Sequence, residues 1–218
     1  MLEGPDGVGK TTCCNKIDTI LTKDLKLKTM IISGLLPRFK SFITRHSTNS
    51  EKMDIMLNSF QNVIDILEEN KVNDVVTILD RFLPSTFAYQ IFGSLEFTPD
   101  IGLDHPFEYK ELMDKYKRMN KYFYNYFKVN IIRLNAESEI IISRIKDRPS
   151  DILDAYYTRN YLRINQGYDI YFKKLSAYLK KENIESVKML HLDTSYGLKG
   201  YHTKADIYLN DEIQSMFL

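Results

Sequence analysis

Apolar residues along the chain recur with two different spacings, and the two spacings alternate. In residues 51–69, Met53, Leu57 and Ile64 follow the 3.6-residue period of an amphipathic helix. The next apolar run, residues 75–79, reads VVTIL and is rich in β-branched residues, as in a buried strand. The same interpretation predicts helices over residues 10–25, 51–69, 109–127, 137–146 and 151–181 and strands over residues 28–33, 75–79, 129–134 and 187–192.

This alternation predicts an α/β fold. Strands separated by helices form βαβ crossovers, which require a mostly parallel sheet flanked by helices. The chain has no internal repeat, low-complexity tract or flexible linker, so we expect one domain over residues 1–218. In such sheets ligands bind at the carboxyl ends of the strands, and the loops that follow strands are therefore where functional residues are expected.

Composition and charge exclude several classes of protein. Of 218 residues, 44% are apolar and 27% are charged, which excludes a disordered or collagen-like chain. The formal net charge of +1 creates no field for a polyanion, so we expect no nucleic-acid and no membrane partner. The two cysteines, Cys13 and Cys14, are adjacent, which disfavours a disulfide or a zinc site. We found no signal peptide or apolar run long enough to span a membrane, and we expect a cytoplasmic protein.

Residues 4–11, GPDGVGKT, match the phosphate-binding pattern GxxxxGK[ST] at every fixed position. A chance match in a chain of this length has odds of about one in a hundred. The pattern predicts a P-loop NTPase fold that binds ATP and Mg²⁺. We expect Lys10 to bind the phosphates and Thr11 to ligate Mg²⁺. The backbone of Gly4, Gly7, Gly9 and Thr12 is expected to surround the phosphates. A glycine-rich turn before a helix would explain the glycines but not the Lys-Thr pair.

The start of the chain departs from the usual context of this motif. Only Met1, Leu2 and Glu3 precede Gly4, whereas a strand usually has about five residues. We therefore expect the first strand to be truncated or vestigial.

A second candidate motif follows the strand over residues 75–79. Asp80 at a strand's carboxyl end is suited to holding Mg²⁺ or its water, and Arg81 is suited to binding a second phosphate. An isolated Asp-Arg pair at a helix start would more often be a solvated pair. The longer string DRFLPSTFAYQ, residues 80–90, favours the functional interpretation.

GPDGVGKTT and DRFLPSTFAYQ together resemble the thymidylate kinases, whose motifs read GxDGxGK[ST] and DRYxxSxxAYQ. Further along, Arg144, Lys146 and Arg148 resemble that family's basic lid, at about residues 144–151. Residues 151–154, Tyr161 and Tyr168 resemble the element after the lid, and residues 193–195 resemble the loop near the adenine.

The resemblance implies that the protein phosphorylates dTMP to dTDP with ATP and Mg²⁺. It implies that Asp6 and Arg81 position the acceptor phosphate and that Tyr89 packs beneath the deoxyribose. Ser85 and Gln90 would be further substrate contacts. Since position 7 is Gly, the extra catalytic cation is assigned to the lid, through Arg144 and Arg148. We also expect small-molecule nucleotide substrates and a homodimer.

Departures from the family pattern leave the base open. Residues 33–45 keep only a proline and some arginines of the expected segment, and Arg38 is the candidate acceptor contact there. Ser59 and Ile55 stand where an arginine and a phenylalanine would contact the base. Residues 204–218 have no counterpart and are expected to be an amphipathic helix or a dimer contact.

Three functions remain possible at this stage. The first is a thymidylate-kinase-like enzyme. The second is a kinase for another deoxynucleoside monophosphate or for a deoxynucleoside. The third is a non-catalytic P-loop protein that binds a nucleotide without transferring phosphate.

Overall fold

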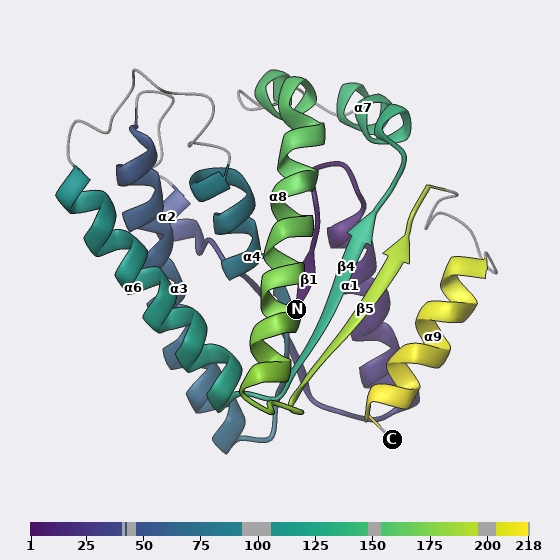
Figure 1. Cartoon of the computed structure of the whole chain (residues 1–218). Helices are drawn as coiled ribbons and strands as arrows, with labels where there is room; N and C mark the ends of the chain where they lie inside the picture. Colours follow the sequence, from purple (N-terminus) through teal and green to yellow (C-terminus); the bar gives the residue numbers. More distant parts are fainter. Residues whose placement is uncertain (41, 43–46, 93–105, 148–153, 196–203, 218) are drawn as a thin grey trace.

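The computed structural model of the chain describes residues 1–40, 42, 47–92, 106–147, 154–195 and 204–217. A five-stranded sheet forms the centre, with strand order β2-β3-β1-β4-β5 and every pairing parallel (Figure 1). The predicted α/β class is therefore confirmed. The strands are β1 (Leu2–Glu3), β2 (Thr29–Ser33), β3 (Val76–Asp80), β4 (Val129–Asn135) and β5 (Val187–Asp193).

Helices cover both faces of this sheet, as the crossover rule predicts. One apolar cluster joins the sheet to α3 (Asn49–Val72), α6 (Pro106–Tyr126) and α8 (Asp154–Lys181). A second cluster joins it to α1 (Lys10–Thr19), α7 (Ser138–Lys146) and α9 (Lys204–Phe217). Shorter helical segments are η1 (Ile20–Asp24), α2 (Pro37–Lys40), α4 (Leu83–Thr86) and η2 (Phe87–Ile91). No helix in the described ranges is both long and apolar enough to cross a membrane.

Local interactions explain where several elements begin and end. The hydroxyl of Thr48 accepts a hydrogen bond from the Glu51 amide at 3.1 Å, and the Glu51 carboxylate accepts one from the Thr48 amide at 2.7 Å. This capping box starts α3 at Asn49, two residues before the predicted boundary. The helix predicted over residues 10–25 is α-helical only to Thr19, because a π-helical turn follows it.

The C-terminal segment forms the amphipathic helix α9. Leu209, Ile213 and Met216 are buried in the second apolar cluster, so the apolar face of α9 packs inward. The helix contacts β5 and η1. The expectation of an amphipathic helix is thus confirmed, and a role in a dimer stays a prediction.

The first strand is present in the centre of the sheet, but it is only two residues long. Leu2 lies opposite Asp80 of β3 and Ile132 of β4. The amino group of Met1 donates a hydrogen bond to the Asn130 carbonyl at 2.7 Å, and burial lowers its pKa to about 6. The expected short strand is therefore found, and it pairs with both β3 and β4.

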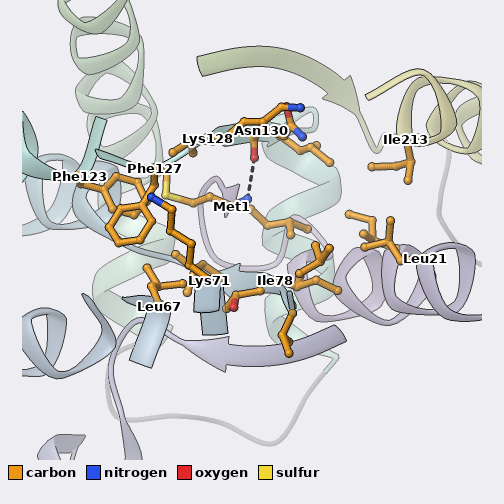
Figure 2. A pocket seen from close by; sticks show the side chains of 18 of the residues that line it. Met1, Leu21, Leu67, Lys71, Ile78, Phe123, Phe127, Lys128, Asn130 and Ile213 are labelled. Carbon is orange, nitrogen blue, oxygen red and sulfur yellow. Dashed lines mark hydrogen bonds between the residues drawn. The ribbon is translucent and has the colours of Figure 1, made fainter. Parts of the chain in front are cut away.

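Beyond Met1, the facing edges of β3 and β4 enclose a cavity of about 510 Å³ (Figure 2). Apolar side chains from both faces of the sheet line much of it, including Leu67, Phe123 and Ile213. Lys71, Asp74 and Lys128 are polar residues of the same lining. The cavity occupies the place where a longer β1 would run.

Candidate active site

Residues 4–9 form a loop that connects β1 to the first turn of α1. Gly4, Gly7 and Gly9 have positive φ angles of 148°, 78° and 93°. A Cβ atom at Gly4 would lie 2.3 Å from the carbonyl oxygen of Leu134 in β4, so this position excludes every side chain. The glycines allow the loop to pass close to β4 and to enter α1 at Lys10, as the motif predicts.

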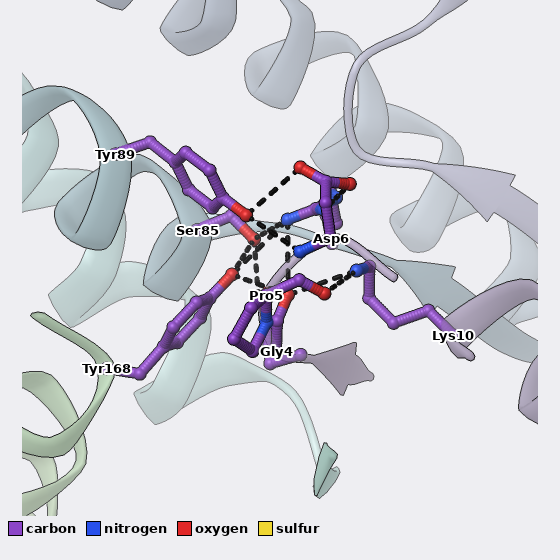
Figure 3. Close-up of polar contacts among 9 residues, drawn as sticks. Gly4, Pro5, Asp6, Lys10, Ser85, Tyr89 and Tyr168 are labelled. Atoms are coloured by element: carbon purple, nitrogen blue, oxygen red, sulfur yellow. Dashed lines mark hydrogen bonds and ion pairs between the residues drawn. The ribbon is translucent and has the colours of Figure 1, made fainter. Parts of the chain in front are cut away.

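Lys10 is the first residue of α1, and its side chain folds back over the loop. It is only 7% exposed, and Nζ donates hydrogen bonds to the carbonyls of Gly4 at 3.1 Å and Pro5 at 2.7 Å (Figure 3). Burial and the nearby charge of Arg81 lower its pKa to about 8. An ammonium group binds charged oxygens more strongly than neutral carbonyls, so an incoming phosphate can replace these two partners.

A cavity of about 280 Å³ lies over the loop at the carboxyl edge of the sheet. Its lining comes from the loop, the first turn of α1 and the end of β3, and is Asp6, Gly7, Gly9, Lys10, Thr11, Thr12, Asp80 and Arg81. The fold thus brings the predicted phosphate-binding residues together with Asp80 and Arg81, which are about 70 positions away in the sequence. Gly4 lies beneath them and supplies the carbonyl that Lys10 bonds.

Asp80 and Thr11 have the chemistry that a Mg²⁺ site needs. Oδ1 of Asp80 is buried and has no hydrogen-bond partner among the described residues. A buried carboxylate oxygen without a partner is unfavourable, and a cation or its water would satisfy it. No group of three or more His, Cys, Asp or Glu side chains in the described ranges could hold a metal. Thr11 and Asp80 line the same cavity and offer oxygen atoms, so they fit an ion that takes its other ligands from phosphates and water.

Arg81 and Asp6 form an ion pair at the other side of this cavity. Nη2 of Arg81 lies 2.5 Å from Oδ1 of Asp6, and the two side chains are 25% and 21% exposed. Burial alone would raise the pKa of Asp6, but the charges of Arg81 and Lys10 lower it to about 2. Asp6 is therefore a carboxylate throughout the physiological pH range, and it holds the guanidinium at the edge of the cavity.

Tyr89 completes this pair from the helix that follows Arg81. Its hydroxyl donates to Oδ2 of Asp6 and accepts from the Asp6 amide, both at 3.1 Å. The guanidinium of Arg81 lies over the Tyr89 ring, 5.2 Å from its centre. The structure thus brings together three of the residues that the resemblance assigns to the acceptor.

Ser85 and Gln90 lie on the same helical segment but differ in surroundings. Ser85 is 2% exposed, and its hydroxyl lies 2.8 Å from the Tyr168 hydroxyl (Figure 3). The same hydroxyl donates to Glu3 at 2.6 Å and lies 3.4 Å from Nη1 of Arg81. Oε1 of Gln90 is buried and has no hydrogen-bond partner among the described residues. Ser85 is therefore placed to support Arg81 from behind, while Gln90 has one oxygen left for a ligand.

Arg38 lies away from the loop. It is exposed on α2, donates a hydrogen bond to Oδ1 of Asn62 in α3, and packs over the ring of Phe39. It is not among the residues that line the 280 Å³ cavity. Its predicted role as an acceptor contact stays a prediction.

The lid is described only in part. Arg144, in the last turn of α7, donates to the Thr194 carbonyl at 2.6 Å, and the Thr194 hydroxyl donates to the Val8 carbonyl at 2.8 Å. Arg144 is therefore linked to the loop through the end of β5. Lys146 is exposed, and Arg148 lies outside the described residues. The catalytic roles predicted for Arg144 and Arg148 stay predictions.

Ser59 has a structural contact that the sequence did not indicate. It is completely buried in α3, where its hydroxyl donates to the Gly34 carbonyl and accepts from the Leu36 amide, both at 2.9 Å. Phe60 is buried against Phe82, with ring centres 4.5 Å apart. Ser59 thus braces the segment after β2, and its hydroxyl is occupied by backbone groups.

Sequence reasoning missed two residues of this region, Glu3 and the hydroxyl of Tyr168. In the sequence Glu3 is one of three residues before the loop. A carboxylate in an apolar strand directly before Gly4 is unusual and could have indicated a buried polar contact. Tyr168 was noted only as a spaced tyrosine, and its hydroxyl donates to the Gly4 carbonyl at 3.1 Å. Nη1 of Arg81 donates to the Tyr168 hydroxyl at 3.3 Å, and the Phe82 amide, directly after Arg81, donates to Glu3 at 2.6 Å.

The parallel sheet, the glycine loop at the carboxyl end of β1 and the lysine that follows define the P-loop NTPase fold. No protein-family model matches the sequence, and no curated protein matches it. Among solved structures, the chain is similar to a thymidylate kinase from Ehrlichia chaffeensis, with a TM-score of 0.57 and 15% sequence identity. The alignment covers 100% of this chain and 96% of that one. At this identity the likeness establishes the fold.

Proposed function

We propose that the protein transfers a phosphoryl group from ATP to a deoxynucleoside monophosphate, most specifically from ATP to dTMP to give dTDP. One observation carries this proposal. Two separate anion-binding groups, Lys10 with the loop amides and Arg81 held by Asp6, line one cavity of about 280 Å³. A donor and an acceptor phosphate need two such groups facing each other.

On the donor side, the loop amides and the amino end of α1 receive the triphosphate. Lys10 leaves the Gly4 and Pro5 carbonyls and pairs with phosphate oxygens, where its charge offsets the charge of the transferred group. Since its pKa is about 8, the lysine is largely protonated at neutral pH before ATP arrives.

On the acceptor side, Arg81 presents its guanidinium to the monophosphate while Asp6 fixes its orientation. Tyr89 supports Asp6 and offers its ring to the sugar. Neither side requires an acid or a base from the protein, because phosphoryl transfer depends mainly on positioning and charge compensation.

Mg²⁺ fits beside the donor site, where Thr11 and Asp80 would hold it directly or through water. When bound, it neutralises charge on the phosphates. The unpaired Oδ1 of Asp80 is the observation that supports this assignment.

A second candidate is a kinase for another deoxynucleoside monophosphate. It is favoured by Ser59, which stands where the thymidylate kinases have a base-binding arginine and whose hydroxyl bonds to two backbone groups, the Gly34 carbonyl and the Leu36 amide. The reaction and the roles of Lys10, Asp6 and Arg81 would be the same in both cases.

The test is a coupled assay of ADP formation from ATP with dTMP, dUMP, dCMP, dGMP, dAMP and thymidine. We expect turnover that requires a monophosphate and is fastest with dTMP. Fastest turnover on thymidine would indicate a nucleoside kinase. ATP binding without acceptor-dependent turnover would indicate a non-catalytic P-loop protein.

We also propose that the protein forms a homodimer in the cytoplasm, binds neither nucleic acid nor membrane, and is a single domain. Sedimentation equilibrium tests the dimer, and a single cooperative unfolding transition tests the domain.

A further inference from the structure

Glu3, the last residue of β1, has a completely buried side chain beneath the loop. A buried carboxylate is unfavourable unless its oxygens are bonded. Both oxygens are bonded here: Oε1 accepts from the Phe82 amide and Oε2 from the Ser85 hydroxyl, each at 2.6 Å. Glu3 does not line the 280 Å³ cavity, so its carboxylate acts on the segment behind Arg81 and not on the phosphates themselves.

The backbone at Arg81 is the first thing that Glu3 fixes. Arg81 has a φ angle of 69°, in the left-handed region that non-glycine residues rarely adopt. A hydrogen bond stands on each side of this turn: the Arg81 amide donates to the Leu2 carbonyl at 3.0 Å, and the Phe82 amide donates to Glu3. Such a conformation persists only when its surroundings stabilise it, and both of these hydrogen bonds are accepted by residues of β1.

The second thing that Glu3 fixes is the direction of the Ser85 hydroxyl. Because the hydroxyl proton goes to Glu3, Oγ of Ser85 is an acceptor toward Nη1 of Arg81 at 3.4 Å, and it lies 2.8 Å from the Tyr168 hydroxyl. Nη1 also lies 3.3 Å from both the Gly4 carbonyl and the Tyr168 hydroxyl. One guanidinium nitrogen is therefore held by three oxygens, while the other pairs with Asp6.

We propose that Glu3 is a positioning residue for the acceptor site: its carboxylate holds the turn at Arg81 and orients the Ser85 hydroxyl, which together keep the Arg81 guanidinium against Asp6. This inference rests on the proposed function, in which Arg81 binds the acceptor phosphate. It adds a residue that touches neither substrate.

Protonation of Glu3 would undo this arrangement. A proton taken up from solvent on Oε2 turns that oxygen into a donor toward Ser85, and the Ser85 proton must then point toward Tyr168 or Arg81. Glu3 then no longer orients this hydroxyl as an acceptor, and where the Ser85 proton points toward Arg81, Nη1 loses one of its three acceptors.

Burial raises the pKa of Glu3 to about 7, although the Ser85 hydrogen bond and the charge of Arg81 act to lower it. The proton therefore binds near neutral pH. Other charged or titratable groups around the carboxylate are the Met1 amine just before β1, Lys10 on α1, Tyr116 and Tyr124 on α6, and Tyr168 and Tyr171 on α8. The Met1 amine and Lys10 have pKa values of about 6 and 8, so they also titrate in this pH range. A comparison of the wild type with a variant at residue 3 is therefore needed to assign the pH dependence to Glu3.

The decisive variant is Glu3→Gln, which keeps the shape of the side chain and mimics the protonated form. It should raise KM for dTMP about tenfold, the usual cost of a lost charged hydrogen bond, with KM for ATP within about twofold. The acidic limb of kcat/KM for dTMP that is centred near pH 7 should disappear.

Ser85→Ala should give the same KM change, and the double variant should add little to the effect of either single variant. Glu68→Gln, in α3, is the matched control and should change none of these values.

The variant is expected to fold. The folded protein keeps the Glu3 proton up to a pH of about 7, whereas the unfolded chain loses it near pH 4.5, so the stability of the wild type falls as the pH rises between these values. Glutamine has no such loss, and Glu3→Gln should melt at or above the wild-type temperature at pH 8.

Two outcomes would overturn the proposal. One is an unchanged KM for dTMP in Glu3→Gln, and the other is an equal rise in both KM values, which indicates a structural role. If the wild type shows no acceptor-dependent turnover, the proposed function fails, and the positioning role is then measured by NMR of the arginine Nε–H groups. A sharp, immobilised Arg81 signal that becomes averaged in Glu3→Gln supports positioning without any substrate, and an unchanged signal contradicts it.

Discussion

Arg81 and Asp6 lie 75 positions apart in the sequence, and their side chains meet at 2.5 Å over the phosphate-binding loop. The contact joins the loop after β1 to the turn after β3, two neighbouring strands of the sheet. It places the guanidinium of Arg81 in the lining of the same cavity as Lys10, close enough for its charge to lower the pKa of the lysine. Several of the following predictions depend on this arrangement.

Lys10→Ala should reduce turnover by about 100- to 1,000-fold while the protein stays folded. Among the described residues the lysine donates to two neutral loop carbonyls, so its charge matters chiefly when phosphates are present. The measurement is kcat in the coupled assay together with the melting temperature. Lys23→Ala, at an exposed lysine of η1, is the control. Near-normal turnover in folded Lys10→Ala would exclude the proposed donor site.

Asp6→Asn should change how stability depends on pH. The folded pKa of Asp6 is about 2, below its ordinary value of 3.8, so the carboxylate stabilises the fold above about pH 4 and loses this effect as the pH falls toward 2. Melting temperatures between pH 5 and pH 2.5 should therefore fall less steeply in Asp6→Asn than in the wild type.

The same variant should raise KM for dTMP, since Arg81 loses its ionic partner. Melting temperatures that fall equally with pH in the two proteins, together with equal KM values for dTMP, would show that the ion pair contributes neither to stability nor to substrate binding.

Extending the chain before Met1 should stabilise it. From the register of β1, an added residue next to Met1 would lie between Ile78 and Asn130, and its side chain would join that of Leu2. A Met-Ile-Val extension should raise the melting temperature by about 5 °C or more by filling the 510 Å³ cavity. A Met-Gly-Ser extension is the control, because it offers the same backbone without the apolar side chains. Equal melting temperatures for the two extensions would mean that the cavity does not accept a strand.

If the proposed function holds, the protein should separate dTMP from dUMP by about tenfold or less in kcat/KM, and purine monophosphates should be poor substrates. The reason is Ser59, whose hydroxyl bonds to Gly34 and Leu36 and supplies no long cationic side chain to the base. Ser59→Ala should lower the melting temperature, because the Leu36 amide loses its acceptor, and should leave the dTMP-to-dUMP ratio unchanged. A changed ratio would place Ser59 in base recognition, and fastest turnover on dGMP would overturn the base assignment.

The sheet and the donor loop were predictable because their signals are local. β-branched runs such as residues 75–79 marked β3 to within one position, and the spacing of Gly4, Gly9, Lys10 and Thr11 marked the loop. The role of Ser59 was not predictable in this way. Its hydroxyl reaches Gly34 only because α3 packs beside the segment after β2, and that packing depends on side chains spread over several elements.

The support of Arg81 was hidden for a related reason. Tyr168 belongs to the apolar stripe of α8, and its hydroxyl reaches a carbonyl 164 positions away. Glu3 is one residue of a very short strand, and only the position of β1 between β3 and β4 turns its side chain toward the segment after Asp80. Long-range contacts of this kind are fixed by topology, which the periodicity of the sequence defines only coarsely.

The place of β1 in the sheet also sets the order in which the protein can assemble during its synthesis. Its partners are β3 and β4, and the second of these begins at Val129. At about 5–20 residues per second, a ribosome needs roughly 6–25 seconds to travel that far. Throughout that interval Leu2 and Glu3 have no complete site to enter, and the segment that carries the phosphate-binding loop stays exposed to chaperones and proteases. The loop is made before β4 and is therefore completed only when β4 arrives and closes the sheet around it.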